Sequence, residues 1–181
     1  MMPVLYPAPL RDLLMHLAMT DLYQAKWTND IHDEWIRNVL ANRPDLKRSQ
    51  LERTRDLMNK HIRDCLVEGY AHLIPSLTLP DSADRHVLAA AIHSLATIIL
   101  TYNLKDFPQQ SLSAYGIAAK HPDIFLSHLI DLGPNIVCSA IKRLRTNLKS
   151  PPINVPQYLK VLEKQSLKKT IEKLNSLSDL L

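Results

Sequence analysis

Apolar residues in the first third of the chain recur at intervals of three and four, the spacing of one helix face. Three such stripes predict three helices: one near residues 8–19, one that Asn29 or Asp30 caps and Pro44 ends, and one around residues 51–62. Their apolar positions are Leu10, Leu13, Leu14 and Leu17, then Ile31, Trp35, Ile36, Val39 and Leu40, then Leu51, Met58 and Ile62. Residues 23–27 read as a short strand, whereas residues 67–74 fit either a strand or a loop.

The middle of the chain alternates between helix and strand patterns. Pro80 and Asp81 open a turn, and residues 87–92 form an apolar, helix-favouring run. Residues 97–101 are a continuous β-branched segment without polar alternation, which is typical of a strand buried on both faces. Residues 117–119 could add a strand, and residues 122–132 a helix. This order predicts an α/β fold with a central parallel sheet flanked by helices.

After Gly133 the pattern is helical, with a break at residues 150–152. We therefore expect a core domain over residues 1–132 and a C-terminal helical appendage over residues 133–181. Residues 155–181 predict two short amphipathic helices with apolar residues at Tyr158, Leu159, Leu162, Leu167, Ile171 and Leu174. These faces either pack on the domain or help to seat a second protein, and deleting residues 151–181 would separate the two readings.

Composition narrows the function classes. The 181 residues, 46% of them hydrophobic, suffice for one buried core. Only three glycines occur, which argues against Gly-rich phosphate-binding loops. The net charge of +4 is compatible with a polyanionic partner, although the basic stretches 47–63 and 142–173 could equally be solvated helix faces. No apolar run approaches the roughly 20 residues of a membrane span, so we expect a cytoplasmic protein with no membrane partner.

The cysteines and histidines favour structural roles. Cys65 and Cys138 fit neither a disulfide framework nor a zinc spacing, and are expected to be buried apolar groups in a reducing cytosol. The eight histidines are scattered without ligand spacing. Trp35 is expected in the core. Tyr102 is left open between packing and stacking on a base.

Polar residues cluster where an α/β sheet places its ligands, at the carboxyl ends of the strands. Asn103 and Asp106 follow the predicted strand 97–101, and Asp81 and Asp84 precede the predicted helix 87–92. Each has an ordinary alternative as a helix cap or turn residue, and Glu34 could be a surface glutamate. Together, gathered carboxylates repel one another unless a cation neutralises them. Oxygen ligands of this kind suit Mg²⁺ or Mn²⁺, which could act on a phosphodiester.

Four stretches, residues 4–14, 33–38, 79–91 and 101–107, resemble a bacterial branch of the PIN-domain family, and the resemblance covers nearly the whole chain. It implies a PIN-like three-layer fold and a Mg²⁺- or Mn²⁺-dependent endoribonuclease that cleaves single-stranded RNA. It also implies a VapC-like toxin of a type II toxin–antitoxin pair, with a cognate antitoxin as partner and a homodimer left open. By motif, Glu34, Asp84 and Asp106 match the catalytic, metal-binding acids. Asn103 and Asp81 are supporting polar groups, with Asp81 a further metal ligand.

One feature of the family pattern is missing. The family begins with a strand that ends in an aspartate, and in this sequence the register of that aspartate falls on Met1. Asp12 is a poor substitute, because it lies on the helix face opposite the leucines. A late start, a truncated product or a degenerate scaffold would each explain this. The chain is therefore expected to bind metal weakly and to cleave slowly.

Two alternative functions stay open. A catalytically impaired PIN scaffold could act as an RNA- or antitoxin-binding module, and it would keep its growth phenotype after replacement of Asp84 by alanine. An unrelated Mg²⁺ phosphohydrolase would act on a small chromogenic phosphate and not on RNA.

Overall fold

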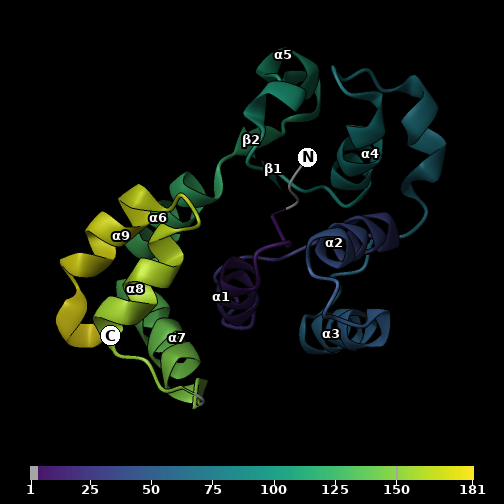
Figure 1. Cartoon of the computed structure of the whole chain (residues 1–181). Coiled ribbons are helices and arrows are strands. Elements are labelled where there is room, and N and C mark those ends of the chain that lie inside the picture. Colours follow the sequence, from purple (N-terminus) through teal and green to yellow (C-terminus); the bar gives the residue numbers. More distant parts are fainter. Residues whose placement is uncertain (1–3, 150) are drawn as a thin grey trace. The chain divides into compact units, whose positions relative to one another are not determined.

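A computed structural model describes residues 4–149 and 151–181 of the chain, and these are mostly helical (Figure 1). The helices are α1 (Ala8–Ala18), α2 (Asn29–Asn42), α3 (Arg48–His61), α4 (Arg85–His93), α5 (Gln109–Leu112), α6 (Pro122–Leu132), α7 (Pro134–Asn147), α8 (Val155–Glu163) and α9 (Lys168–Asn175). The strands are β1 (Ile98–Leu100) and β2 (Ala118–Lys120). The predicted helices and the strand pair of the middle region are confirmed, so the α/β class is correct.

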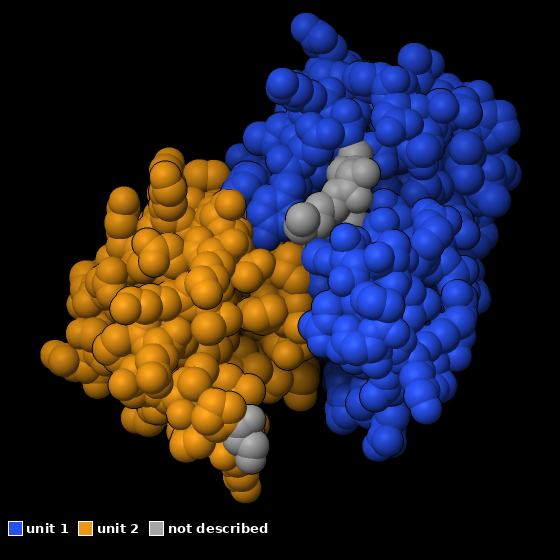
Figure 2. Space-filling view, viewed as in Figure 1, with its two compact units in different colours: residues 1–6, 25–121 blue, residues 7–24, 122–181 orange. Residues whose placement is uncertain are grey.

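The chain divides into two compact units (Figure 2). Unit 1 comprises residues 1–6 and 25–121, and unit 2 comprises residues 7–24 and 122–181. Helices α1 and α6 thus group with the C-terminal helices. Compactness alone does not define a functional domain, so the boundary at residues 132 and 133 stays a prediction.

The sheet of unit 1 consists, within the described residues, of two parallel strands. Ile98, Ile99 and Leu100 of β1 pair with residues 118, 119 and 120 of β2. Ile99 is 4% exposed and lies in a core cluster with the apolar face of α4, which includes Leu88 and Ala89. The connection between the strands carries α5, as expected for parallel strands, which need a crossover.

The prediction that residues 97–101 are buried on both faces is wrong. Ile98 is 39% exposed, whereas its neighbour Ile99 is buried. Successive strand side chains point to opposite faces, and α4 packs against β1. Within the described residues the sheet has two strands, so the predicted three-layer fold stays a prediction.

The predicted strand at residues 23–27 is also wrong, apart from one residue. Trp27 forms an isolated parallel bridge with Leu66, in which Trp27 N donates to the Cys65 carbonyl and Val67 N donates to the Trp27 carbonyl. The segment passes from unit 2 into unit 1 between Gln24 and Ala25, so it packs in two places instead of extending along one sheet.

Helix α2 begins with a side-chain cap from Thr28, not from Asn29 or Asp30 as predicted. Thr28 Oγ1 accepts a hydrogen bond from Ile31 N at 3.1 Å. Thr28 is fully buried. A threonine cap satisfies one of the free amides of the first helical turn, and this leaves Asp30 available to accept a hydrogen bond from the Tyr70 hydroxyl.

A buried polar network holds α2 to α3. Trp35 Nε1 donates to His32 Nδ1 at 2.9 Å, and His32 Nε2 lies 3.0 Å from Asn59 Oδ1. Asn59 Oδ1 also accepts from Trp27 Nε1 at 2.7 Å. Because His32 Nδ1 must accept, the ring is neutral with its proton on Nε2. The predicted core position of Trp35 is confirmed, and the network fixes the helix that carries Glu34.

Unit 2 buries the apolar faces of its helices. The six apolar residues predicted for the last two helices are all buried, and α9 packs against α6 and α8. The packing interpretation is therefore confirmed, and these side chains are not available for a partner protein. Asp123 of α6 further ties α9 in place, because its carboxylate accepts from Lys169 N at 3.0 Å and Thr170 N at 2.8 Å.

Within the described part of the chain, no single helix is both long and apolar enough to cross a membrane. Helices α6 and α7 pass that test only when taken together, and they meet at a bend of 116°. Cys65 and Cys138 are buried free thiols, as predicted, and burial raises the pKa of each.

Candidate metal centre

Asp81 and Asp84 are positioned by a tight turn at the start of α4. Asp81 Oδ1 accepts a hydrogen bond from Ala83 N at 2.8 Å and so caps the 3₁₀ turn Ser82–Asp84, which runs directly into α4. The cap role that the sequence allowed for Asp81 is thus real, and Asp81 remains exposed. Burial of the α4 residues Leu88 and Ala89 anchors the turn, and Asp84 is left only 6% exposed.

Asp106 and Asn103 follow the carboxyl end of β1. Thr101 N donates to the Lys120 carbonyl at 3.0 Å, which extends the pairing with β2 by one residue. Thr101 Oγ1 then accepts from Asn103 N at 3.0 Å and turns the chain out of the sheet. The Asn103 side-chain amide donates to Asp106 Oδ2. Asn103 therefore orients the Asp106 carboxylate.

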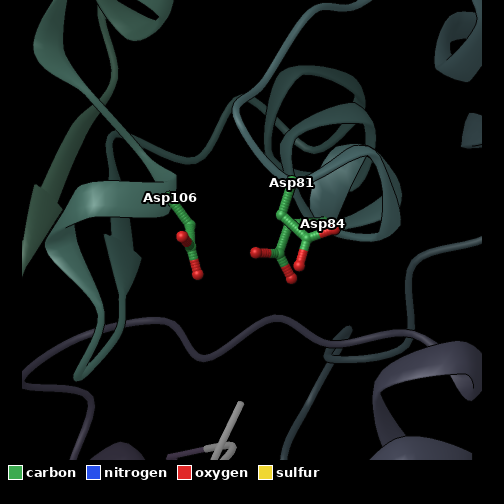
Figure 3. Close-up of side chains that lie close together, drawn as sticks. All are labelled: Asp81, Asp84 and Asp106. Carbon is green, nitrogen blue, oxygen red and sulfur yellow. The ribbon is translucent and has the colours of Figure 1, made fainter.

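The two segments bring three carboxylates together. Asp81, Asp84 and Asp106 each offer an oxygen, and the three oxygens lie within 4.8 Å of one another. Figure 3 shows the Asp81 and Asp84 side chains leaving the start of α4 and facing Asp106, which comes from the segment after β1. The structure therefore gathers three of the five predicted site residues, and Asn103 is hydrogen-bonded to one of them.

Asp84 is the residue whose environment is most unusual. Its Oδ2 atom is buried and has no hydrogen-bond partner among the described residues. The pKa of the Asp84 carboxyl is raised from its ordinary 3.8 to about 6. Burial is the main cause, and the negative charges of Asp81, Asp106 and Glu34 add to it. A buried carboxylate without a partner is costly, and a bound cation would remove that cost.

Glu34 lies on one wall of a polar cavity of about 490 Å³ that also includes Asp81 and Asp84. The first wall is a single face of α2. The second is the 3₁₀ turn and the first turn of α4. The lining residues are Asp30, Asp33, Glu34, Arg37, Asn38, Asp81, Ala83, Asp84 and His86.

This donor set fits a hard divalent cation. The ligand atoms available are carboxylate oxygens, without a thiolate or a set of imidazoles at ligand distance in the described cluster. Mg²⁺ and Mn²⁺ favour such oxygen ligands. The unpartnered, buried Asp84 Oδ2 is the second sign that a positive group belongs at this position.

Several lining residues were not predicted as site residues. Asp30, Asp33, Arg37 and Asn38 share a face with Glu34, since positions separated by three or four residues are neighbours on a helix. That spacing was readable in the sequence once Glu34 was placed in the site. His86 was expected to be a surface or packing residue, yet its Nδ1 atom is buried without a described partner.

The remaining sequence-based expectations for the site concern the N-terminus and Tyr102. The register of the missing first-strand aspartate, Met1, lies outside the described residues. Asp12 is exposed and pairs with Arg11 at 3.6 Å. Tyr102 is half-buried and makes an edge-to-face contact with His121, with ring centroids 5.2 Å apart, and burial raises its pKa to about 12.

Two comparisons with known proteins found relatives of the chain. Residues 122–176 match the family model described as the VapC50 C-terminal domain. The protein named "Putative ribonuclease VapC50" from Mycobacterium tuberculosis (strain ATCC 25618 / H37Rv) is 38% identical over 97 residues, which is 54% of this chain and 57% of that protein. No solved structure matches the chain significantly. The predicted resemblance to VapC-like proteins is confirmed.

Proposed function

From this similarity to a VapC-type ribonuclease, we propose that the chain is a Mg²⁺- or Mn²⁺-dependent endoribonuclease that cleaves single-stranded RNA. The observation that carries the proposal is the convergence of Asp81, Asp84 and Asp106 within 4.8 Å around a buried carboxylate oxygen without a partner. The matched stretch covers little more than half of the relative, so activity, substrate and partners are all part of the proposal.

Each side chain has a distinct role in the proposed site. Asp84 and Asp106 would hold the cation, with Asp81 at the exposed side and Glu34 from α2 completing the acidic set. Asn103 holds the Asp106 carboxylate in place through its side-chain amide. When bound, Mg²⁺ or Mn²⁺ supplies charge neutralisation for the phosphodiester and lowers the pKa of a coordinated water.

We also propose that the chain shares the domain organisation and the toxin role of the PIN-domain family. The proposed organisation is a PIN-like three-layer core domain over residues 1–132 and a helical appendage over residues 133–181. The proposed role is that of the toxin in a type II toxin–antitoxin pair, in which the antitoxin inhibits the toxin. The motif resemblance in the sequence and the VapC name of the relative support this assignment. The buried apolar faces of α8 and α9 indicate that an antitoxin would have to bind other surfaces.

The test is cleavage of a labelled single-stranded RNA with Mn²⁺, comparing the native chain with Asp84→Asn and Asp56→Asn. Asp56 is a matched control, because it is an exposed acid on α3 that pairs with Arg55. We expect Asp84→Asn to abolish Mn²⁺ binding in calorimetry and to reduce cleavage by at least about 100-fold, a usual cost of losing one electrostatic catalytic group. Asp56→Asn should behave as the native chain does.

Other outcomes identify the alternatives. RNA binding without Mn²⁺ binding or cleavage would show an RNA-binding module instead of a nuclease. Hydrolysis of a small chromogenic phosphate together with inert RNA would show a phosphohydrolase. Equal cleavage by the Asp84→Asn variant would exclude the proposed metal centre.

A further inference from the structure

The α2 wall of the cavity changes along its length from negatively charged side chains to side chains that donate hydrogen bonds. Asp30, Asp33 and Glu34 present carboxylates, whereas the next turn of the same face presents Arg37 and Asn38, which carry hydrogen-bond donors. Arg37 lies three residues after Glu34, so their positions are separated by about 4.5 Å along the helix axis. The cavity therefore holds a cationic group one helical turn from Glu34.

Arg37 does not pair with the acids of its own helix. Asp33, four residues earlier, is the neighbour that an arginine on a helix usually contacts, but Asp33 pairs instead with Arg48 of α3 at 3.6 Å. Asp30 accepts from the Tyr70 hydroxyl. No ion pair of Arg37 is found within residues 4–149 and 151–181, and its side chain is exposed at the cavity.

Two neighbouring side chains of the cavity also have polar groups without a hydrogen-bond partner among the described residues. The Asn38 side-chain amide makes no hydrogen bond within the described part of the chain, although Asn38 is half-buried. His86, on the second wall, has a buried Nδ1 atom without a described partner. The Arg37 guanidinium and the Asn38 amide are donors that the fold does not use in an otherwise acidic cavity, and an anionic ligand requires such donors.

Taken with the proposed function, on which it rests, this arrangement leads us to infer that Arg37 binds the RNA phosphate next to the one that is cleaved. The scissile phosphate lies at the acidic residues, where a cation neutralises it. The adjacent phosphate of the same strand meets the Arg37 guanidinium, whose planar donors suit a phosphate in two-point contact. Asn38 supplies a further donor beside it. Arg37 is thus a substrate-positioning residue.

The experiment compares Arg37→Gln and Arg37→Lys with Arg53→Gln, a change of an exposed arginine on α3 that is not at the cavity. Two substrates are used with Mn²⁺: a single-stranded RNA 12-mer and a dinucleotide that has one phosphodiester and no neighbouring phosphate. We expect Arg37→Gln to raise the KM for the 12-mer about tenfold and to leave kcat within about twofold. Its kcat/KM for the dinucleotide should fall by much less than its kcat/KM for the 12-mer, and the values of Arg37→Lys should lie between those of the native chain and Arg37→Gln.

Binding of the 12-mer, measured by fluorescence anisotropy in EDTA over a range of salt concentrations, gives a second readout. Loss of one phosphate contact should reduce the salt slope by roughly 0.7 in Arg37→Gln and leave it unchanged in Arg53→Gln. Equal effects of the two variants on the 12-mer, or equal loss of dinucleotide cleavage in Arg37→Gln, would overturn the inference. A native chain that neither binds Mn²⁺ nor cleaves RNA would refute the proposed function instead, and the salt slopes would still decide the role of Arg37 in binding.

Discussion

The Asp84 carboxylate is both buried and negatively charged, and this combination destabilises the folded, metal-free protein. A carboxyl whose pKa is raised to about 6 in the folded state is favoured in its neutral form. The stability that the neutral Asp84 carboxyl contributes is fully present below the ordinary pKa of 3.8, and it is lost as the pH rises through about 6. At neutral pH the metal-free protein therefore holds an unfavourable charge in a position where a cation would make it favourable.

Replacing Asp84 with asparagine should stabilise the metal-free protein at pH 7.5. The shift corresponds to at most about 3 kcal/mol, and the gain should shrink as the pH falls from 6 toward 4. Urea unfolding in EDTA at pH 4.5 and pH 7.5 measures both values. Excess Mn²⁺ should reverse the order at neutral pH, because only the native chain would be stabilised by binding. A variant less stable than the native chain in EDTA at pH 7.5 would contradict this account.

His32 has the opposite pH dependence. Burial lowers the pKa of its ring below the ordinary 6.5, and Trp35 Nε1 already donates to Nδ1, so protonation would break the network. The stability it contributes is present above pH 6.5 and is lost as the pH falls through the lowered pKa of the folded state. The native chain should therefore lose thermal stability as the pH falls below 6.5.

The histidine prediction is checked by the melting temperature of His32→Gln across that range. Glutamine can still donate to Asn59 but does not titrate, so the variant should have a flatter profile even if its melting temperature at pH 7.5 is lower. His128→Gln, a change of an exposed histidine on α6, should leave the native profile unchanged. A profile of His32→Gln as steep as the native one would assign the acid sensitivity to other groups.

The sequence indicated the acids of the candidate centre because polar residues are expected where a strand ends and where a helix begins. Asp84, Asp106 and Asn103 are examples. Their roles as ligands remain predictions. Arg37 was not singled out, because a lone arginine on a helix face is ordinary until the structure shows that Asp33 pairs with Arg48 instead. The partner of a surface charge depends on tertiary packing, which a single sequence does not encode locally.

Helix α9 depends on a cap supplied by another helix. Its N-cap residue, Leu167, offers no side-chain acceptor. Asp123 of α6 takes that role for Lys169 N and Thr170 N and also accepts from Thr170 Oγ1. Sequence patterns detect caps that lie next to their helix, so this one, 46 and 47 residues away from the amides it binds, could not be predicted.

Asp123→Ala should destabilise the protein by about 2–4 kcal/mol, since it leaves buried donors unsatisfied. Asp131→Asn on the same helix is the matched control. Asp131 is exposed and pairs with Lys173, and losing an exposed pair costs about 1 kcal/mol or less. Urea unfolding monitored by circular dichroism compares the two. Equal effects would mean that the cap contributes no more than a surface ion pair.

The strands illustrate a different limit of prediction. Residues 97–101 were correctly predicted to form a strand, since β-branched residues favour a pleated backbone. The burial of both faces could not be deduced, because an apolar run fits a central strand and an edge strand equally well. Ile98 is the residue that separates the two, and its exposure depends on which elements cover the sheet.

The division of the molecule into two units does not follow the order of the chain. Helix α1 packs against α7 and α8, and its residues Leu10 and Leu17 are fully buried. The repeating leucines predicted the helix but gave no information on which segment covers them. Residues 122–176, which match a family model as a contiguous stretch, are thus completed in unit 2 by a helix from the other end of the chain.

A fragment of residues 122–181 should consequently fold poorly alone. It would expose the surfaces of α7 and α8 that α1 covers, and unpaired apolar faces lower cooperativity. Adding a peptide of residues 7–24 should restore sharp thermal unfolding and dispersed amide resonances. A peptide with Leu10 and Leu17 replaced by serine should not. A fragment that unfolds cooperatively by itself would show that α1 is dispensable for this unit.

The two sequence segments of unit 2 are separated by residues 25–121, so they are synthesised at different times during translation. Helix α1 leaves the ribosome with its leucines uncovered, and all of residues 25–121 must be synthesised before α6 follows. At the usual 5–20 residues per second, this is a delay of roughly 5 to 20 s. For that interval the nascent chain presents an amphipathic helix without its partners, which is a typical substrate for a chaperone.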